Sequence, residues 1–243
     1  MPTTADRENV ALFGTLAADW WDPDGASKLL HRVNPARLGF VRDAAIRHFG
    51  RSPKARRALE GLCILDVGCG GGLLAEPLAR MGANVTGIDA GEDVIATARA
   101  HAAGQGLTID YRSGDVVRLA EEIPGQFDLV TCLEVLEHVT DLQAFLLALR
   151  KLLKPGGMLV YSTPNRTLMS WAVLIVGAEQ IVKLIPRGAH DWKQFLTPDE
   201  LTMRLAAAGL VAGKAKGISW TPARGFIVND DVRVNYIGTA VPA

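Results

Sequence analysis

Residues 65–72, Leu-Asp-Val-Gly-Cys-Gly-Gly-Gly, decide the fold of this 243-residue chain. The apolar run that ends at Val67 predicts a β-strand, and the pattern from about Leu73 predicts a helix, so the glycines form the turn between them. Glycine adopts positive φ and lets a ligand approach the backbone closely. The turn therefore predicts a cofactor site, and the alternative is a turn that only joins two elements.

The spacing within this turn favours S-adenosylmethionine over a dinucleotide. Dinucleotide sites prefer Gly-x-Gly-x-x-Gly, but Leu73 stands where the third glycine belongs. Asp66, at the start of the turn, suits a cationic ligand better than a pyrophosphate. Asp89 ends a second strand-like run about twenty residues on, where a carboxylate can accept from ribose hydroxyls. A dinucleotide-binding protein such as a reductase is the competing class.

Length, charge and cysteine content bound the remaining possibilities. A chain with 49% hydrophobic residues is long enough for one sizeable domain over residues 1–243. Lys plus Arg and Asp plus Glu both number 26, so charge gives no case for nucleic acid as a partner. Three cysteines without metal-ligand spacing indicate a reducing, cytoplasmic environment. The first residues do not resemble an export signal, and no apolar run reaches the length of a membrane span.

Strand-like apolar runs alternate with amphipathic helical patterns along the chain. This alternation predicts a doubly wound parallel α/β sheet, in which ligands bind beyond the carboxyl ends of the strands. We expect strands over 62–67, 84–88, 107–112, 127–133, 158–163, 210–218 and 231–239. We expect helices over 6–19, 35–49, 73–81, 91–104, 141–153 and 198–208. Residues 1–50 then form an N-terminal helical arm, and residues 164–196 form an apolar helical insertion between strands.

Several segments, taken in order, resemble a known family. Asp66–Gly72, Gly87–Asp89, Phe127–Cys132 and Leu153–Gly157 resemble the class I S-adenosylmethionine-dependent methyltransferases. The flanking segments resemble the ubiquinone biosynthesis O-methyltransferase family: Trp20-Trp21-Asp22, His31–Gly39, Glu134-Val135-Leu136-Glu137-His138, Val176–Glu179 and His190–Phe195. The resemblance runs from about Trp20 to Tyr236 and implies a Rossmann-like sheet of seven strands, mostly parallel with the last antiparallel.

The resemblance also implies which residues bind the cofactor. The expected S-adenosylmethionine site comprises Arg37, Gly68, Gly70, Asp89, Asp115 and Leu133. A guanidinium such as that of Arg37 can bind the methionine carboxylate through two hydrogen bonds. Asp115 is placed near the adenine amino group, and Leu133 contributes apolar surface. Without the resemblance, Arg37 also reads as a solvated arginine of the N-terminal arm.

Glu134, Glu137 and His138 are the expected catalytic residues. If a helical turn follows the strand that ends near Leu133, these three side chains project from one face. Two carboxylates and an imidazole suit a hard divalent ion such as Mg²⁺, and the resemblance implies such a site at these positions. Two other interpretations stay open. The segment can be an ordinary solvated helix start, or His138 can act as a general base without a metal.

The implied activity is O-methylation of polyprenylated ubiquinone precursors, namely 2-polyprenyl-6-hydroxyphenol and 3-demethylubiquinol. The alternative is a methyltransferase of the same fold that acts on a different phenol or on a carboxyl group. Partner enzymes of ubiquinone biosynthesis are also expected from the resemblance. Trp20 and Trp21 are expected to divide two tasks, one covering the pocket and the other anchoring the arm.

The segment 168–187 is too apolar for an ordinary surface insertion. It includes the apolar run Ser170–Ala178, which is flanked by the basic residues Arg166, Lys183 and Arg187. One interpretation is that it lies in a membrane interface, which places the protein peripherally on the inner face of the cell membrane. The other is a helix packed over the active site or in a dimer contact.

Overall fold

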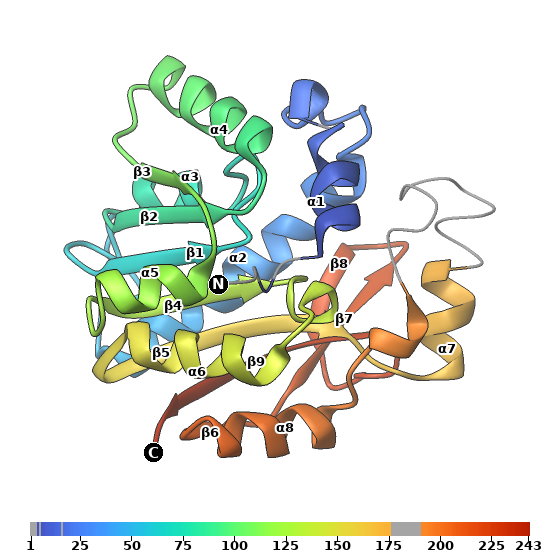
Figure 1. Ribbon diagram of the computed structural model, residues 1–243. Coiled ribbons are helices and arrows are strands. Elements are labelled where there is room, and N and C mark those ends of the chain that lie inside the picture. The colour runs from blue at the N-terminus through green and yellow to red at the C-terminus, as the bar shows by residue number, and fades with distance from the viewer. Residues whose placement is uncertain (1–3, 5, 16, 176–190) are drawn as a thin grey trace.

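The computed structural model describes residues 4, 6–15, 17–175 and 191–243, and its strands belong to one nine-stranded sheet (Figure 1). The sheet order is β3-β2-β1-β4-β5-β9-β7-β8, and β6 also pairs with β9. The strands are β1 (Cys63–Val67), β2 (Asn84–Asp89), β3 (Asp110–Ser113), β4 (Phe127–Leu133), β5 (Leu153–Pro164), β6 (Leu210–Ala212), β7 (Lys216–Thr221), β8 (Gly225–Asn229) and β9 (Asn235–Pro242). Neighbouring strands among β1 to β5 pair in parallel. Strand β9 pairs antiparallel with β5, β6 and β7, and β7 pairs antiparallel with β8.

The Rossmann-like α/β class is confirmed, but the strand count of seven is wrong. The expected strand over 210–218 is two strands, β6 and β7, which pair with different parts of β9 and are separated by residues 213–215. The expected strand over 231–239 starts only at Asn235. Strand β8 precedes it and pairs with β7 as a hairpin, which closes at Gly225 with φ of 68°. These added strands extend the antiparallel edge of the sheet.

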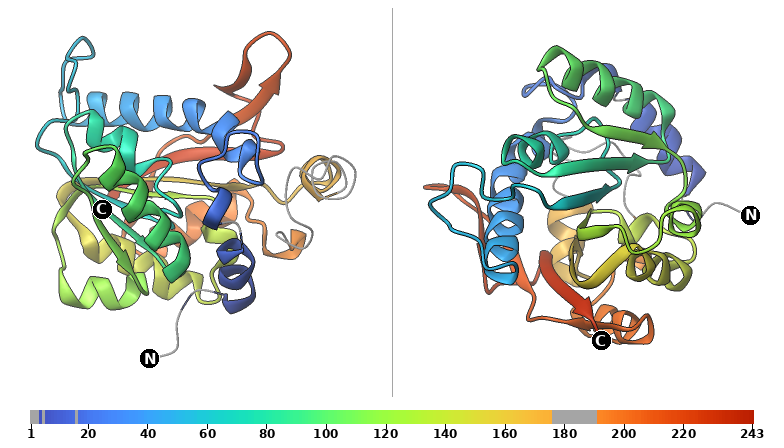
Figure 2. Two further views of the ribbon diagram at one scale, coloured as in Figure 1. Left: turned by 90° about the horizontal axis from the view of Figure 1, so that it is seen from above. Right: turned by 90° about the vertical axis from the view of Figure 1, so that its left-hand side faces the viewer.

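Helices cover both faces of the sheet (Figure 2). The helices are α1 (Arg7–Gly14), α2 (Lys28–His48), α3 (Ala75–Arg80), α4 (Glu92–Gly104), α5 (Val116–Glu122), α6 (Leu142–Leu152), α7 (Leu168–Ser170) and α8 (Pro198–Ala207). One core joins α5, α6 and α8 to one face of the strands, and a second core joins α2, α3 and α4 to the other. The buried thiols Cys69 and Cys132 lie in these cores, so the cysteines here are packing residues.

Helix boundaries agree with the expectations where capping signals are strong. Helix α8 begins at Pro198 after a capping box formed by Thr197 and Glu200, as the sequence predicts. Helix α2 instead starts at Lys28 and runs through Pro35, which the sequence places at a helix start because proline is favoured there. Helix α5 was not expected, and the Asp115 side chain caps it by accepting from the Val117 N–H at 2.7 Å.

The apolar insertion is described only in part. Helix α7 continues as a π-helical turn over 171–175, and the following residues 176–190 lie outside the described part of the chain. The second half of the segment 168–187 and the motif residues Val176–Glu179 and His190 therefore have no structural account here. Among the described helices, none has the length and apolar character needed to cross a bilayer.

Candidate active site

The glycine turn after β1 has the geometry that a close ligand contact requires. Gly68 adopts φ of 68°, and the N–H groups of Gly68 and Cys69 donate to the Ile88 carbonyl of β2 at 2.8 and 3.2 Å. A Cβ atom on Gly68 would lie 2.3 Å from the Val135 side chain. A Cβ atom on Gly70 would lie equally close to the Trp20 ring. Larger residues therefore do not fit at either position.

Asp89 and the glycine turn form one hydrogen-bonded unit. The Asp89 carboxylate accepts from the Gly70 N–H at 3.0 Å and from the Gly91 N–H at 2.9 Å. Burial raises the pKa of Asp89 above its usual value, although these backbone hydrogen bonds act in the opposite direction. The carboxylate at the end of β2 is thereby fixed beside the turn, where the sequence places it.

A single cavity of about 940 Å³ connects most of the expected site residues. Its volume lies near the upper end of small-molecule sites. The expected residues that line it are Arg37, Gly68, Gly70, Asp89, Asp115, Leu133, Glu134 and His138. Two residues do not line it. Glu137 lies behind the cavity wall, and Asp66 is buried against β4, where it accepts from the Thr131 hydroxyl at 2.7 Å.

Arg37 reaches the cavity from α2 and pairs with a carboxylate of the protein. One of its Nη atoms lies 3.2 Å from Glu134 Oε1. The same carboxylate accepts from the Ser162 hydroxyl at 2.6 Å and from the Asn235 side-chain amide at 2.8 Å. Glu134 has φ of 57°, and it is the one non-glycine residue with positive φ in the described chain. Such a conformation persists where surrounding contacts fix it, and it is common at functional sites.

Glu137 and His138 lie side by side where β4 leads into a 3-10 helix, Leu136–His138. Glu137 is buried and accepts from the Thr163 hydroxyl at 2.8 Å. Its other oxygen, Oε1, has no hydrogen-bond partner among the described residues and lies 4.0 Å from His138 Nε2. Burial, followed by the nearby Glu134 charge, raises the pKa of Glu137 to about 8.

The expected projection of Glu134, Glu137 and His138 from one face is wrong. Ser162 and Thr163 are adjacent on β5 and point to opposite faces of the sheet, so the carboxylates that they bind also lie on opposite faces. The left-handed conformation of Glu134 causes this separation, because no regular helical turn contains all three residues. No three His, Cys, Asp or Glu side chains of the described residues converge as a metal site.

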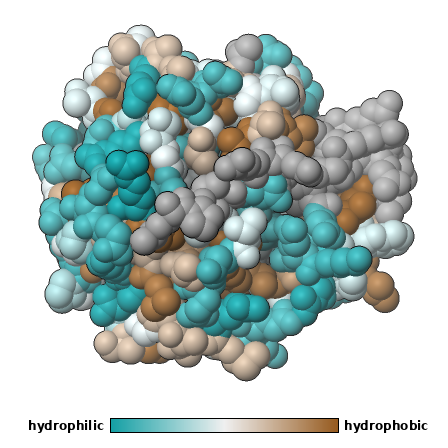
Figure 3. Space-filling view, viewed as in Figure 1, coloured by the Kyte–Doolittle hydropathy of each residue, from teal (hydrophilic) through white to brown (hydrophobic). Residues whose placement is uncertain are grey.

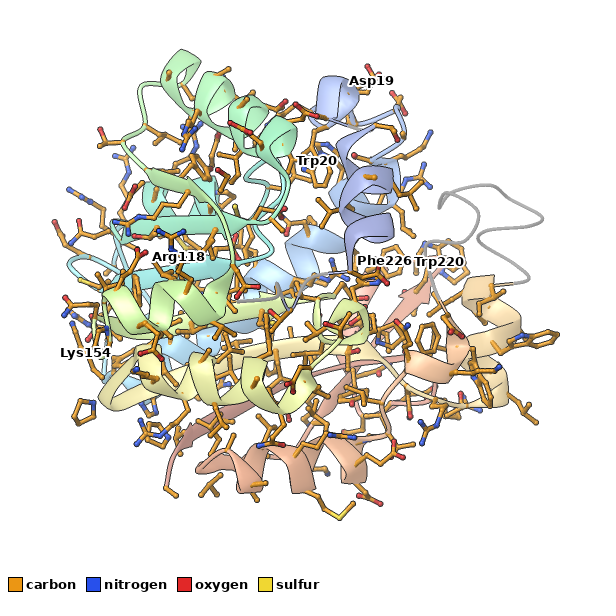
Figure 4. All side chains as sticks on the ribbon, viewed as in Figure 1. Asp19, Trp20, Arg118, Lys154, Trp220 and Phe226 are labelled. Atoms are coloured by element: carbon orange, nitrogen blue, oxygen red, sulfur yellow. The ribbon has the colours of Figure 1, made fainter. Side chains whose placement is uncertain are left out.

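The N-terminal arm packs directly on the glycine turn (Figure 4). Trp20 is buried against the turn and lines the cavity. The Trp21 indole N–H donates to the Gly71 carbonyl at 2.9 Å, and its ring stacks on His101 with centroids 3.5 Å apart. Trp20 therefore lies at the cavity, whereas Trp21 connects the arm to the glycine turn.

The start of the chain also reaches the cavity, next to Asp115. The Asp115 carboxylate accepts from the Thr4 N–H at 2.6 Å and from the Thr4 hydroxyl at 3.0 Å. The Thr4 carbonyl accepts from the Thr140 N–H at 2.9 Å. No recognisable motif marks Thr4, nor Ser162, Thr163 and Asn235, which bind the two glutamates. Only the fold brings these residues to their partners.

The fold and the cavity define a methyltransferase of the S-adenosylmethionine-dependent class. A family model described as a methyltransferase domain matches residues 65–161. The ubiquinone biosynthesis O-methyltransferase of Azorhizobium caulinodans is 46% identical over 99% of this chain and 95% of its own length. That of Caulobacter vibrioides is 47% identical over 96% and 93%. The chain therefore belongs to the ubiquinone biosynthesis O-methyltransferase family.

Solved structures share the fold at low sequence identity. The magnesium protoporphyrin IX methyltransferase of Synechocystis PCC 6803 with bound S-adenosylhomocysteine has a TM-score of 0.67 and 22% identity. The match covers 97% of this chain and 96% of that one. The same enzyme with bound S-adenosylmethionine has a TM-score of 0.60. At this identity, the likeness supports the Rossmann-like methyltransferase fold.

Proposed function

We propose that this chain transfers the methyl group of S-adenosylmethionine to a phenolic oxygen of polyprenylated ubiquinone precursors. The expected acceptors are 2-polyprenyl-6-hydroxyphenol and 3-demethylubiquinol. The observation that carries the proposal is the cavity that joins the glycine turn and Asp89 to His138, in a member of this family. Such a cavity can hold a donor at one end and an acceptor at the other.

The residues at the glycine turn fit the methyl donor. Gly68 and Gly70 leave room beside the backbone, and the Asp89 carboxylate faces the cavity where it can accept from ribose hydroxyls. We propose that Arg37 binds the methionine carboxylate by exchanging its contact with Glu134. When bound, the donor supplies an activated methyl group on a sulfonium, and it leaves as S-adenosylhomocysteine. We propose Asp115 and Leu133 as further walls of this site.

His138 is proposed as the base that removes the phenolic proton. A phenol titrates near pKa 10, so at neutral pH its oxygen needs help to become a nucleophile. His138 lines the cavity, and Glu137 lies behind its ring with an oxygen that lacks a hydrogen bond among the described residues. A hydrogen bond across this gap of 4.0 Å would orient the imidazole. The oxygen–methyl bond forms as the sulfur–methyl bond breaks, and the proton remains on His138.

The rate of methyl transfer by the variant His138→Ala tests whether His138 is the base. We expect turnover to fall by roughly 10²–10⁴, the usual contribution of a general base, because the phenolic proton loses its acceptor. Calorimetry with S-adenosylhomocysteine should give an affinity close to that of the wild type. The matched control is His48→Ala, because His48 bonds the Gly156 carbonyl on the protein surface. Near-normal turnover by His138→Ala would refute the assignment.

Binding of Mg²⁺ through Glu134, Glu137 and His138 stays a prediction from the family resemblance. Carboxylates on opposite faces of β5 do not fit one shared octahedral ion, so we assign no catalytic step to a metal. Turnover before and after chelation, with Mg²⁺ restored, tests the prediction. A loss that Mg²⁺ reverses supports it, and turnover that resists chelation contradicts it.

We also propose that the protein works at the inner face of the cell membrane, with the segment 168–187 in the interface. The described part of this segment exposes Leu168 (81%), Trp171 (46%) and Val173 (44%). In Figure 3, hydrophobic (brown) patches lie on the right-hand side of the molecule, which is where Figure 1 shows α7. Apolar side chains of this kind bind a lipid interface. Other enzymes of ubiquinone biosynthesis are the proposed partners there.

Flotation with liposomes tests the membrane proposal. We expect Trp171→Glu to float less than the wild type, because a charged side chain disfavours the interface. The control is Val211→Glu, an exposed apolar residue on edge strand β6. Equal flotation of all three proteins would refute the proposal.

A further inference from the structure

The same cavity also has an apolar part whose lining includes none of the residues assigned to the reaction. Its lining there comes from the β7–β8 hairpin, through Ile218, Trp220 and Phe226, and from the α7 region, through Met169 and Val173. We call this part the outer slot. Its apolar lining contrasts with the carboxylates and backbone amides around the glycine turn.

The hairpin forms one wall of the outer slot (Figure 4). Trp220 lies opposite Phe226 in the hairpin register, and Ile218 shares the face of Trp220, because strand side chains alternate. Ile218 is buried and Phe226 packs against the core that contains α2. Trp220, in contrast, is 60% exposed. The wall is therefore fixed at its inner end and exposes a large aromatic side chain at its outer end.

The α7 region forms the second wall. Met169 and Val173 line the same cavity and are 45% and 44% exposed. Exposed apolar side chains are ordinary when they stand singly on a surface, but here they gather on two elements around one opening. Two apolar walls favour a ligand that is itself apolar.

The polar side chains of Arg233 and Asn235 near the slot are bound by carboxylates of the protein. The Arg233 guanidinium binds the Asp231 carboxylate through two contacts of 2.8 Å. The Asn235 amide is held by Glu134. The outer slot therefore offers mainly apolar contact, which argues against a charged acceptor group at this end of the cavity.

We propose that the outer slot binds the first isoprenoid units of the acceptor's tail, with Trp220 as the residue that selects acceptors carrying a tail. This inference rests on the proposed function and adds the site of tail recognition to it. The slot is continuous with the part of the cavity that His138 lines, so a tail in it leaves the aromatic ring near the methyl donor. A hydrocarbon chain in the slot covers Trp220, Met169 and Val173, and so removes their apolar surface from water.

The test compares two acceptors that differ only in the tail. One is a 3-demethylubiquinol with two isoprene units, and the other has a methyl group in place of the tail, so that neither needs a membrane. For each variant, kcat/KM is measured with both acceptors, and the tailed-to-tailless ratio is compared with the wild type. We expect Trp220→Ala to lower this ratio about tenfold, the low end of the discrimination that apolar pockets give. Met169→Ala, on the opposite wall, should also lower it, but by less than Trp220→Ala, because the methionine side chain is smaller.

Val211→Ala serves as the matched control, because Val211 is 57% exposed and lies outside the cavity. Its ratio should stay within about twofold of the wild type. If Trp220→Ala and Met169→Ala both keep the wild-type ratio while binding S-adenosylhomocysteine normally, the outer slot does not bind the tail. If the wild type methylates neither acceptor, the proposed function itself fails, which is a different result.

Discussion

The two ends of the cavity are built in different ways. At the donor end, backbone hydrogen bonds connect the glycine turn to Ile88 and Asp89, and the Trp21 indole bonds to the Gly71 carbonyl. At the acceptor end, the walls are side chains such as Trp220 and Met169, which are about half exposed. The donor end is thus fixed by the backbone, whereas the acceptor end depends on side chains.

This difference follows the order of the sheet. The donor end uses β1, β2 and β4, which are neighbouring parallel strands within residues 63–133. The acceptor end uses the hairpin β7–β8 and α7, which follow β5 and belong to the antiparallel side. A donor common to many enzymes needs one rigid site, whereas each acceptor needs its own walls. Changes at the donor end should therefore affect stability and donor affinity, and changes at the acceptor end should affect selectivity.

The largest expected effect comes from the buried carboxyl group of Asp66 at the donor end. Burial raises the pKa of Asp66 from 3.8 to about 7, and the Asp89 charge adds to the increase. Between about pH 4 and 7 the unfolded chain releases this proton while the folded protein keeps it, so stability falls as pH rises. The full cost above pH 7 is about 4 kcal/mol.

Asp66→Asn should remove this pH dependence, because the amide has no proton to lose. We expect wild type and variant to have similar free energies of unfolding at pH 4, and the variant to be the more stable at pH 8. Urea unfolding at both pH values measures this difference. Asp110→Asn, an exposed carboxyl at the start of β3, is the control and should follow the wild type. If the free energy of unfolding of Asp66→Asn changed with pH as steeply as that of the wild type, Asp66 would not carry a buried charge.

The donor end could be predicted because its signals lie within short stretches of sequence. The strand, the glycines and Asp89 form contacts between adjacent strands, so spacing alone places them together. The family resemblance added Arg37 and His138, which do line the cavity. The alternation of strands and helices also gave the sheet class, since the central strands β1 and β4 are buried between helices.

The acceptor end could not be predicted in the same way. The opposite placement of Glu134 and Glu137 depends on a left-handed backbone at Glu134, which residue types do not reveal for a non-glycine residue. Asn235 reaches Glu134 from 101 positions away in the sequence. The hairpin strands β7 and β8 are short, and each contains a glycine, Gly217 and Gly225. The sequence pattern therefore does not predict how the two strands pair.

A smaller effect is expected from Asp89→Ala, which tests the rigidity of the donor end. The change removes the acceptor for the Gly70 and Gly91 N–H groups as well as the proposed ribose contact. A hydrogen bond to a charged group contributes about 1.5–3 kcal/mol, so the Kd for S-adenosylhomocysteine should rise roughly 10- to 100-fold. Calorimetry measures this change, with Asp110→Ala as the control. An unchanged Kd would remove Asp89 from the donor site.

The smallest effect is expected from Trp21→Phe, which separates the hydrogen bond of the arm from its stacking. Phenylalanine can keep the contact with His101 but cannot donate to the Gly71 carbonyl. A neutral hydrogen bond contributes about 1 kcal/mol, so the Tm should fall by about 2–4 °C and donor affinity by a few fold. Trp220→Phe, the matched change at the acceptor end, should leave both values unchanged because its ring is exposed. Equal losses in the two variants would mean that the arm does not stabilise the donor end specifically.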